Sequence, residues 1–420
     1  MTPNSAQDQL REIVTALARI PRLPTSRGER LAAGQIRDRL AAAGCDAWVE
    51  PVPAFRSYQW PVGLLSGIAV AAGLLAGRQP GRQPGRQPGR GSRVGPRIVR
   101  LAGAAGGLVA AAGVVDDVTG GPLLTRRMLA RRRTTTNVIA ETGDPAAPAT
   151  LIVLAHHDAS PSGLVFDQGL ERRLAARHPQ WLERLTSNPP LWWPVIAGPA
   201  LVCAGSLLGR RGRLLRRAGI VLAAVSAAAM IDIGVRPAVP GANDNLSGVA
   251  ALVALAEALR GRPPVGLRVL LVSAGAEEAL QQGIRAFAAE HLRHLPRERT
   301  WVVNLDTIGS GRLVLLEGEG PVRMYDYDAR FKDYLVGCAD QVQVDVLRGL
   351  RSRSSTDGCV PQRLGFPTAT LVSIDQQRLI PHYHLDSDLP EHVDYGCVHD
   401  AVRLVEQVAH RLAGSVGSRG

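Results

Sequence analysis

Four apolar segments, joined in pairs by linkers whose only charged side chains are arginines, constrain the fold of this 420-residue chain most. The first pair covers about 58–77 and 98–115, and its linker contains a threefold GRQP repeat that is too rich in Gly and Pro for a packed element. The second pair covers about 191–208 and 218–235 and is joined by GRRGRLLRR. Each segment approaches the length of about 17 to 25 apolar residues that a membrane-spanning helix needs.

The composition of these segments favours transmembrane helices over buried helices of a soluble protein. They are rich in Ala and Gly, which let membrane helices approach closely. Trp60, Trp192 and Trp193 stand where aromatic side chains commonly meet the membrane interface. We therefore expect two transmembrane hairpins that are inserted into one soluble domain. The hairpins are residues 58–115 and 191–235, and the domain consists of residues 1–57, 116–190 and 236–420.

The net charge of +12 is accounted for by the arginines of the two linkers. A nucleic-acid-binding protein would spread basic side chains over its folded domain, so the charge argues against a nucleic-acid partner and for contact with membrane lipid. By the positive-inside rule, the linkers lie in the cytoplasm and the soluble domain on the extracytoplasmic side of a multi-pass protein. The basic stretch at 126–133 opposes this orientation. Because each hairpin returns to its starting side, all soluble segments share one side of the membrane in either case.

With the hairpins set aside, the sequence predicts an α/β fold with a mostly parallel central sheet that is flanked by helices. The segments ATLIVLAHHD, LRVLLVSAGAEE and TWVVNLDTIG are predicted as strands, because their continuous apolar runs are typical of strands buried on both faces. Helical spacing at 7–18, 28–43 and 395–412 supplies helices. Strands that alternate with helices indicate a parallel sheet, and ligands bind beyond the carboxyl ends of such strands.

Acidic and imidazole side chains follow these strands at the point where each strand ends. His156, His157 and Asp158 close the first of these predicted strands, Glu277 and Glu278 close the second, Asp306 closes the third, and His384 follows TATLVSI after a short loop. Each has an ordinary interpretation alone, since a single His is more often a surface or core residue and a Glu pair is usually solvated. Together they indicate a metal site, because buried carboxylates this close repel one another unless cations compensate. Carboxylates mixed with imidazole suit zinc without any cysteine.

The stretch PGANDNLSGVAALVALAEAL places Asp244 directly before an apolar helix. A carboxylate at this position is ordinarily a helix cap, which satisfies free N–H groups of the first turn. The alternative is a metal ligand, because the helix starts from the sheet edge that carries the other acids. Capping and ligation do not exclude each other, since backbone groups of Asn243 and Asn245 can cap the helix instead.

Six motifs occur in one order along the chain: AHHDAS, GANDNLSG, AEEALQQGIRAF, NLDTIG, TDGCVPQRLGFP and YHLDSDLPEHVD. In this order they resemble the di-zinc aminopeptidase family of peptidase clan MH, which includes bacterial leucyl aminopeptidases, glutamate carboxypeptidases and glutaminyl cyclases. The resemblance covers nearly all of the soluble sequence and omits the hairpins. It implies the zinc exopeptidase fold and a metallopeptidase with two Zn²⁺ per chain. By that similarity, His156, Asp244 and Asp306 would bind one zinc, and Glu278, His384 and the shared Asp244 would bind the other.

The resemblance also implies catalytic roles. Asp158 would orient His156 through the second ring nitrogen of the imidazole. Glu277 would act as the general base, taking a proton from the metal-activated water and passing it to the leaving amine. TDG stands where the family commonly has Ser-Asp-His, a departure that affects the expected substrate preference more than metal binding.

These observations lead to the hypothesis of a membrane-anchored di-zinc exopeptidase, an aminopeptidase that acts on peptides with a free N-terminus. The first alternative is a transferase like the glutaminyl cyclases, which use a single-zinc site. The second is an inactive receptor or scaffold that has the peptidase fold on a membrane. Retention of all five expected ligands favours the enzyme with two metals, and lipid binding by the arginine linkers is compatible with it.

Overall fold

The computed structural model describes residues 3–78, 94–180 and 184–417, and these divide into two compact units. The first unit consists of 1–56, 132–189 and 236–420, and the second of 57–131 and 190–235. The second unit continues beyond the predicted end of the first hairpin at 115. The reason is that helix α4 (Val94–Val118) is longer than predicted and that α5 (Leu124–Leu129) packs against it.

An eight-stranded sheet forms the centre of the first unit, in the order β1-β2-β4-β3-β5-β11-β6-β9. The strands are β1 (Asp46–Ala54), β2 (Arg133–Gly143), β3 (Thr150–His156), β4 (Arg268–Ala274), β5 (Thr300–Leu305), β6 (Arg312–Leu315), β9 (Val346–Leu347) and β11 (Thr368–Ile374). The four strands at its centre, β4, β3, β5 and β11, run parallel to one another. A smaller sheet has the order β10-β7-β8 and comprises β7 (Gly318–Glu319), β8 (Tyr325–Asp326) and β10 (Arg351–Ser352).

The sheet is largely parallel, as predicted, but it also contains three antiparallel pairs of strands. β1 pairs antiparallel with β2, β2 with β4, and β6 with β11. Antiparallel strands can be joined by a short connection, whereas parallel neighbours need a crossover. β6 follows β5 after only a short loop, so it runs back in the opposite direction and lies antiparallel to the strand group that contains β5.

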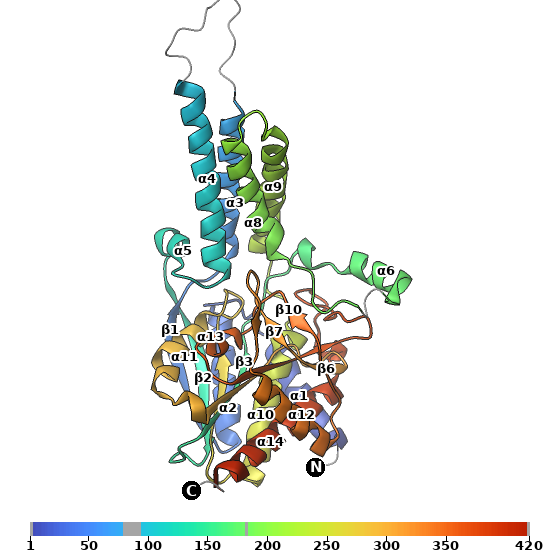
Figure 1. Cartoon of the computed structure of the whole chain (residues 1–420). Helices are drawn as coiled ribbons and strands as arrows, with labels where there is room; N and C mark the ends of the chain where they lie inside the picture. The colour runs from blue at the N-terminus through green and yellow to red at the C-terminus, as the bar shows by residue number, and fades with distance from the viewer. Residues whose placement is uncertain (1–2, 79–93, 181–183, 418–420) are drawn as a thin grey trace, which may run out of the picture. The chain divides into compact units, whose positions relative to one another are not determined.

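Side chains of β3 alternate between the two faces of the sheet, as expected of a strand that is buried on both sides. Leu151 and Val153 lie in the larger core, whereas Ile152 and Leu154 pack with Phe287 on the other face. The larger core is covered by α1 (Pro3–Ala18), α2 (Arg27–Ala42), α10 (Ser247–Gly261), α12 (Ala329–Val342) and α14 (Tyr395–Gly417). The opposite face carries α11 (Gln282–Glu290) and α13 (Cys359–Arg363), so helices flank both faces of the sheet (Figure 1).

Short helical turns connect these layers. They are η2 (Leu164–Phe166), α6 (Gly169–Arg177), η3 (Ala242–Leu246), η4 (Leu292–His294), η5 (Arg297–Arg299) and η6 (Pro390–His392).

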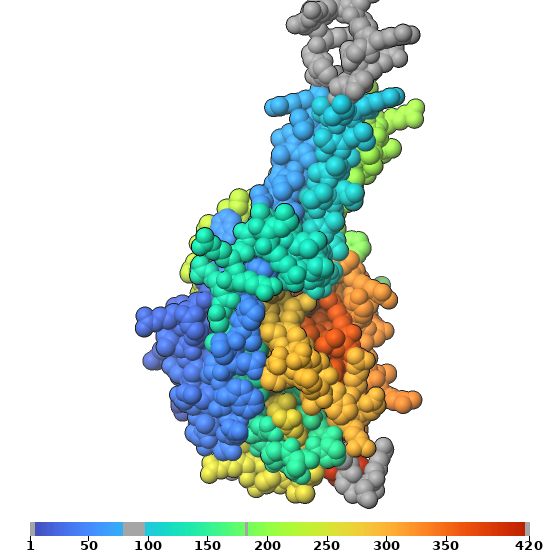
Figure 2. Space-filling model, turned by 90° about the vertical axis from the view of Figure 1, so that its left-hand side faces the viewer, coloured from blue at the N-terminus to red at the C-terminus, as the bar shows by residue number. Residues whose placement is uncertain are grey.

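On the face shown in Figure 2, the blue segment that contains β1 and the gold segment that contains α11 lie side by side. The edge strand β1 is therefore partly covered by a helix, which limits its exposure to other chains.

The second unit is a bundle of apolar helices: α3 (Gln59–Gly77), α4, α8 (Trp192–Leu207) and α9 (Arg213–Val235). Three helical segments are long and apolar enough to cross a membrane by length and composition, namely Gln59–Gly77, Arg97–Val118 and Arg213–Val235, while α8 is shorter. Glycines bring α8 and α9 close together, since a Cβ at Gly198 would lie only 2.8 Å from the backbone N of Ala223.

Candidate metal centre

The predicted site residues meet at the carboxyl end of the parallel strands. His156 is the last residue of β3, and Asp306 directly follows β5. Glu277 and Glu278 follow β4 after a turn, and His384 lies in the loop after β11. Because these four strands are parallel neighbours, their carboxyl ends share one edge of the sheet. The tertiary structure therefore brings together residues that the sequence places far apart.

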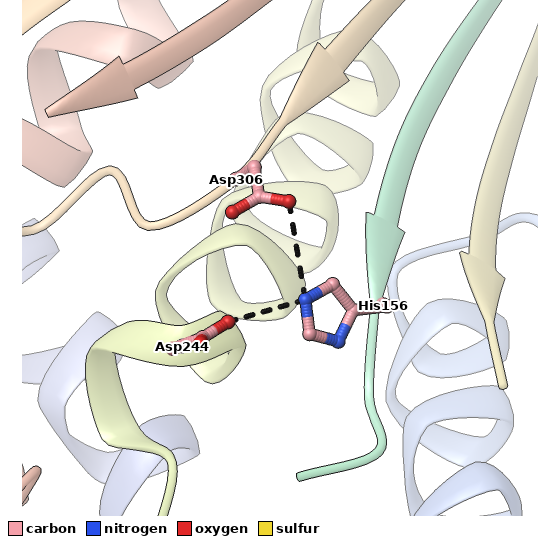
Figure 3. Close-up of side chains that lie close together, drawn as sticks. All are labelled: His156, Asp244 and Asp306. Atoms are coloured by element: carbon pink, nitrogen blue, oxygen red, sulfur yellow. Dashed lines mark ion pairs between the residues drawn. The ribbon is translucent and has the colours of Figure 1, made fainter. Parts of the chain in front are cut away.

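His156, Asp244 and Asp306 form the first group of candidate ligands (Figure 3). The Nε2 atom of His156 lies 3.2 Å from Oδ1 of Asp244 and 4.0 Å from Oδ2 of Asp306. All three residues are buried, and one ligand atom from each lies within 4.8 Å of the others. This separation is short enough for the three atoms to share one cation.

Asp244, Glu278 and His384 form the second group, and all three are buried. The Nε2 atom of His384 lies 3.0 Å from Oδ2 of Asp244 and 3.1 Å from Oε1 of Glu278. Asp244 therefore belongs to both groups and directs a different oxygen to each histidine. Such a shared carboxylate is the arrangement that supports two metal ions about 3.5–4 Å apart.

The hydrogen-bonding capacity of the three side chains in the second group is not satisfied within the group. A single Nε2–H of His384 can donate to only one of the two carboxylate oxygens that face it. Oδ2 of Asp244 and Oε1 of Glu278 are both buried without a hydrogen-bond partner. A buried acceptor that is left unsatisfied costs about 1–3 kcal/mol, and more when it is charged. Cations between these oxygens and nitrogens would remove that cost, so the residues fit a metal-binding role.

Charges within the cluster shift the pKa values of its members. Burial alone would lower the pKa of His384, but Glu278 and Asp244 raise it to about 10. Burial raises the pKa of Asp306 to about 7, and the neighbouring Asp244 adds to this, although His156 opposes it. Carboxylates and imidazoles that shift one another's pKa values this far indicate a site of concentrated negative charge, which a cation would stabilise.

In the loop around Asp244, one side chain caps helix α10 and a different side chain faces the histidines. Oδ1 of Asn245 accepts hydrogen bonds from N–H of Gly248, in the first turn of α10, and from N–H of Thr307. The side chain of Asn243 bonds Gly309 and Ser310 instead. The helix is thus capped by the side chain of Asn245, where backbone groups were expected, and the carboxylate of Asp244 is directed to the histidines.

Asp158 acts mainly on the loop that carries the two glutamates. Its carboxylate accepts hydrogen bonds from N–H of Glu277 at 2.9 Å and from N–H of Glu278 at 3.0 Å. Its contact with His156 is weaker, since Nδ1 lies 3.3 Å from the backbone oxygen of Asp158 and 3.6 Å from Oδ1. We predicted that Asp158 orients His156. Asp158 also fixes the backbone of Glu277 and Glu278.

The turn after β4 explains how two adjacent glutamates reach the same edge. β4 ends at Ala274, earlier than the sequence suggested. A Cβ at Gly275 would lie 2.4 Å from Oγ1 of Thr135, so the close approach of these two segments requires glycine. Ala276 then adopts a φ of 51°, which turns the chain out of the extended conformation. Glu278 becomes buried, while Glu277 stays partly exposed.

Sequence reasoning missed several residues around the site. The ring of Tyr383 stacks on His384 with centroids 3.9 Å apart, and Phe166 meets His384 edge-on at 4.5 Å. Burial, together with the charges of Asp244 and Glu278, raises the pKa of the Tyr383 phenol well above its usual value. Tyr383 directly precedes a predicted ligand in the motif YHLDSD, so its position was a signal that could have been used.

Asp357, in the TDG motif, is also buried beside this cluster. Both of its carboxylate oxygens lack a hydrogen-bond partner. Burial raises the pKa of Asp357 well above its usual value, and the nearby charges of Asp158 and Asp306 add to this, whereas His156 opposes it. The sequence marked this motif only as a departure from the family pattern, whereas in the structure its acid interacts electrostatically with members of the cluster.

The fold is that of an α/β protein, and its site gathers carboxylates and imidazoles that suit a metal ion. Residues 228–409 match Peptidase family M28, which confirms the resemblance that the six motifs predicted. The matched region contains Asp244, Glu277, Glu278, Asp306 and His384. No curated protein matches the sequence.

Solved structures share the fold at low sequence identity. An aminopeptidase from Aneurinibacillus sp. strain AM-1 is 15% identical, with a TM-score of 0.54 and coverage of 96% of this chain and 93% of that chain. A leucine aminopeptidase precursor from Bacteroides thetaiotaomicron is 13% identical, with a TM-score of 0.53 and 96% coverage of both chains. A glutaminyl cyclase from Tannerella forsythia is 12% identical, with a TM-score of 0.55 and coverage of 96% and 98%. These similarities establish the fold and leave the reaction to the residues of the site.

Proposed function

We propose that this protein is a membrane-anchored di-zinc aminopeptidase that removes residues from peptides with a free N-terminus. The observation that carries the proposal is the position of Asp244, whose two oxygens lie 3.2 and 3.0 Å from Nε2 of His156 and of His384. Asp306 completes one group of ligands and Glu278 completes the other. The match to Peptidase family M28 supports a peptide substrate.

Zinc fits these donors, because it accepts imidazole nitrogen and carboxylate oxygen and needs no thiolate. His156 and Asp306 would hold one ion, Glu278 and His384 the other, with Asp244 between them. When bound, two Zn²⁺ would supply Lewis-acid chemistry, polarising the scissile carbonyl and making water a better nucleophile at neutral pH.

Glu277 is the best-placed general base among the acids of the cluster. It is partly exposed, unlike Glu278, and its backbone is held by Asp158. Burial raises the pKa of Glu277 well above its usual value, and Asp357 and Glu278 add to the shift, although His156 opposes it. A carboxylate with a raised pKa accepts a proton from the attacking water and returns it to the leaving amine more readily than an ordinary glutamate does.

Tyr383 is suited to donate a hydrogen bond during the reaction. Its raised pKa keeps the phenol protonated at neutral pH. Its ring is fixed against His384 by stacking, which orders the hydroxyl at little further entropic cost. We assign it the role of stabilising the negative charge that develops on the carbonyl oxygen of the substrate.

The charge of the site favours an aminopeptidase over a carboxypeptidase. Among the described residues, six carboxylates gather at or beside this edge, and together they outweigh the charge of two divalent cations. They are Asp158, Asp244, Glu277, Glu278, Asp306 and Asp357. The remaining negative charge attracts a protonated α-amino group and repels a C-terminal carboxylate.

The second unit supports membrane anchoring through the side chains on its surface. Large apolar side chains are exposed along its helices, as expected of a lipid-facing surface. They include Leu74, Ile98, Leu101, Leu108, Val109, Val221, Val225 and Ile231. A topology reporter fused into the GRQP linker tests the expected cytoplasmic position of that linker, and a reporter signal from the opposite side would reverse the orientation.

Zinc content and peptide release test the catalytic proposal directly. The full-length chain in detergent should contain about two zinc ions per chain and release amino acids from free peptides, but not from N-acetylated ones. A content near one, with cyclisation of N-terminal glutamine, would favour the cyclase alternative. A metal-free and inactive protein would favour the receptor alternative.

A further inference from the structure

Arg22 is a fully buried arginine that lies outside the six motifs and joins the loops that carry two of the candidate ligands. Its Nε donates to the backbone oxygen of His157 at 2.9 Å, and one of its terminal nitrogens donates to Pro240 at 2.8 Å and to Gly241 at 3.2 Å. His157 directly follows His156, and Gly241 lies three residues before Asp244. One guanidinium thus contacts both loops.

The remaining donors of Arg22 hold it in place. Its other terminal nitrogen donates to the backbone oxygens of Leu17 at 3.0 Å and Ile20 at 3.1 Å, at the end of α1. All of its acceptors are carbonyls, so the side chain is a rigid connection and not part of an ion pair. Burial lowers the pKa of Arg22 only to about 10, which leaves it charged at neutral pH.

Asp388 holds the next residues of the same loop. Its Oδ1 accepts from N–H of Asn243 at 2.8 Å, and its Oδ2 accepts from N–H of Asp244 at 3.0 Å. Its backbone oxygen accepts from N–H of Ala242 at 3.2 Å. The carbonyls at the start of the loop therefore face a guanidinium, and the N–H groups that follow face a carboxylate.

The close fit at Gly241 supports this arrangement. Gly241 has a φ of 58°, and a Cβ there would lie 2.8 Å from a terminal nitrogen of Arg22 and 2.6 Å from the backbone oxygen of Asp244. A side chain at this position would push the guanidinium and the loop apart. The glycine thus allows Arg22 to approach the backbone directly.

We propose that Arg22 and Asp388 are positioning residues, which fix the backbone from Pro240 to Asp244 so that the carboxylate of Asp244 can serve two metal ions. The inference rests on the proposed di-zinc function and adds residues that act through the ligands. Groups that orient metal ligands typically change metal affinity by about 10–100-fold when they are altered.

The test measures metal binding of full-length variants in detergent. R22M removes all donors, R22K keeps the charge but replaces the planar fork by a single ammonium, and D388N offers an amide in place of the second acceptor. Arg268, which pairs with Glu141 at the far end of β4, provides the matched control R268M. Zn²⁺ affinity is measured by competition with a chromophoric chelator, and the ligand geometry by the absorption spectrum of the Co²⁺-loaded protein.

We expect about 10–100-fold weaker Zn²⁺ binding and an altered Co²⁺ spectrum for R22M, R22K and D388N, with wild-type values for R268M. Thermal unfolding of the metal-free proteins separates this effect from a loss of stability. If the three variants lose stability but bind Zn²⁺ with wild-type affinity and spectrum, Arg22 and Asp388 are structural only and the inference is wrong. If the wild-type protein binds neither Zn²⁺ nor Co²⁺, the proposed function is wrong together with the inference. Failure of the inference alone is thus distinguished by wild-type protein that binds metal.

Discussion

Oδ2 of Asp244 lies 3.0 Å from Nε2 of His384, while Oδ1 of the same carboxylate lies 3.2 Å from Nε2 of His156. One aspartate, placed just before α10, thus connects a histidine at the end of β3 with a histidine in the loop after β11. The relationship explains why the chain keeps an acid among buried groups that would otherwise repel it. It also makes Asp244 the residue on which the proposed metal centre depends most.

Replacement of Asp244 by Asn should abolish binding of both metal ions. The amide lacks the negative charge and the second acceptor oxygen that the two groups of ligands share. Zinc analysis of purified protein should show less than one ion per chain, and peptide hydrolysis should fall below detection. D386N, at an exposed aspartate in the loop of His384, is the matched control and should keep the wild-type content. Unchanged zinc in D244N would remove the bridging role.

Replacement of Glu277 by Gln should lower kcat by about 10²–10⁴-fold, the usual contribution of a general acid–base group. The metal content should stay unchanged, because Glu277 is not among the ligand groups. E278Q should instead lose zinc, which separates the roles of these adjacent residues. The measurement is steady-state hydrolysis of an unblocked dipeptide, and activity that survives in E277Q would assign the base elsewhere.

Replacement of Tyr383 by Phe should lower kcat by about 10²–10³-fold with little change in KM, because the lost hydrogen bond acts on charge that develops only in the transition state. The ring would remain and keep its stacking on His384. Y325F, on β8 of the smaller sheet, is the control. Equal kcat values for Y383F and wild type would contradict the role of the phenol.

Removal of metal should lower the unfolding temperature of the protein. A ligand present at 100 times its Kd stabilises the folded state by about 2.7 kcal/mol. This corresponds to roughly 5–10 °C for a large domain. Differential scanning fluorimetry with and without a chelator measures the shift, and Zn²⁺ should restore the original value. Identical transitions in both conditions would argue against a bound metal.

Because of Glu317, we expect the free energy of unfolding to change with pH in the acid range. Burial opposes its charge, but hydrogen bonds from Arg348 and Lys332 lower the pKa of Glu317 to about 2. Its contribution is therefore complete above the unfolded pKa of about 4.3 and is lost as the pH falls towards about 2. We expect E317Q to cost about 1–3 kcal/mol at pH 7 and much less near pH 2, as measured by denaturant unfolding. If E317Q and the wild type differ by the same free energy of unfolding at pH 7 and near pH 2, this prediction is wrong.

The sequence predicted the main strands and helices of the first unit, because their hydrophobic patterns are local. It also predicted which residues would follow each strand, since a run such as TWVVNL ends visibly at Asp306. It did not predict that β4 stops at Ala274, because that end depends on the close contact of Gly275 with Thr135 on another strand. The direction of β6 likewise depends on a short loop, which hydrophobic patterning does not describe.

What the sequence determined by itself was the set of chemical groups: acids and imidazoles after apolar strands, and apolar helices around arginine linkers. Only the tertiary structure decided which atoms meet, because convergence depends on strand order and on the path of each loop. Asp244 shows the difference, since its sequence fits a helix cap as well as a ligand, and the hydrogen bond from Gly248 to Asn245 leaves its carboxylate free. Arg22 and Asp388 could be recognised only in three dimensions, because they act on backbone groups that are distant in the chain.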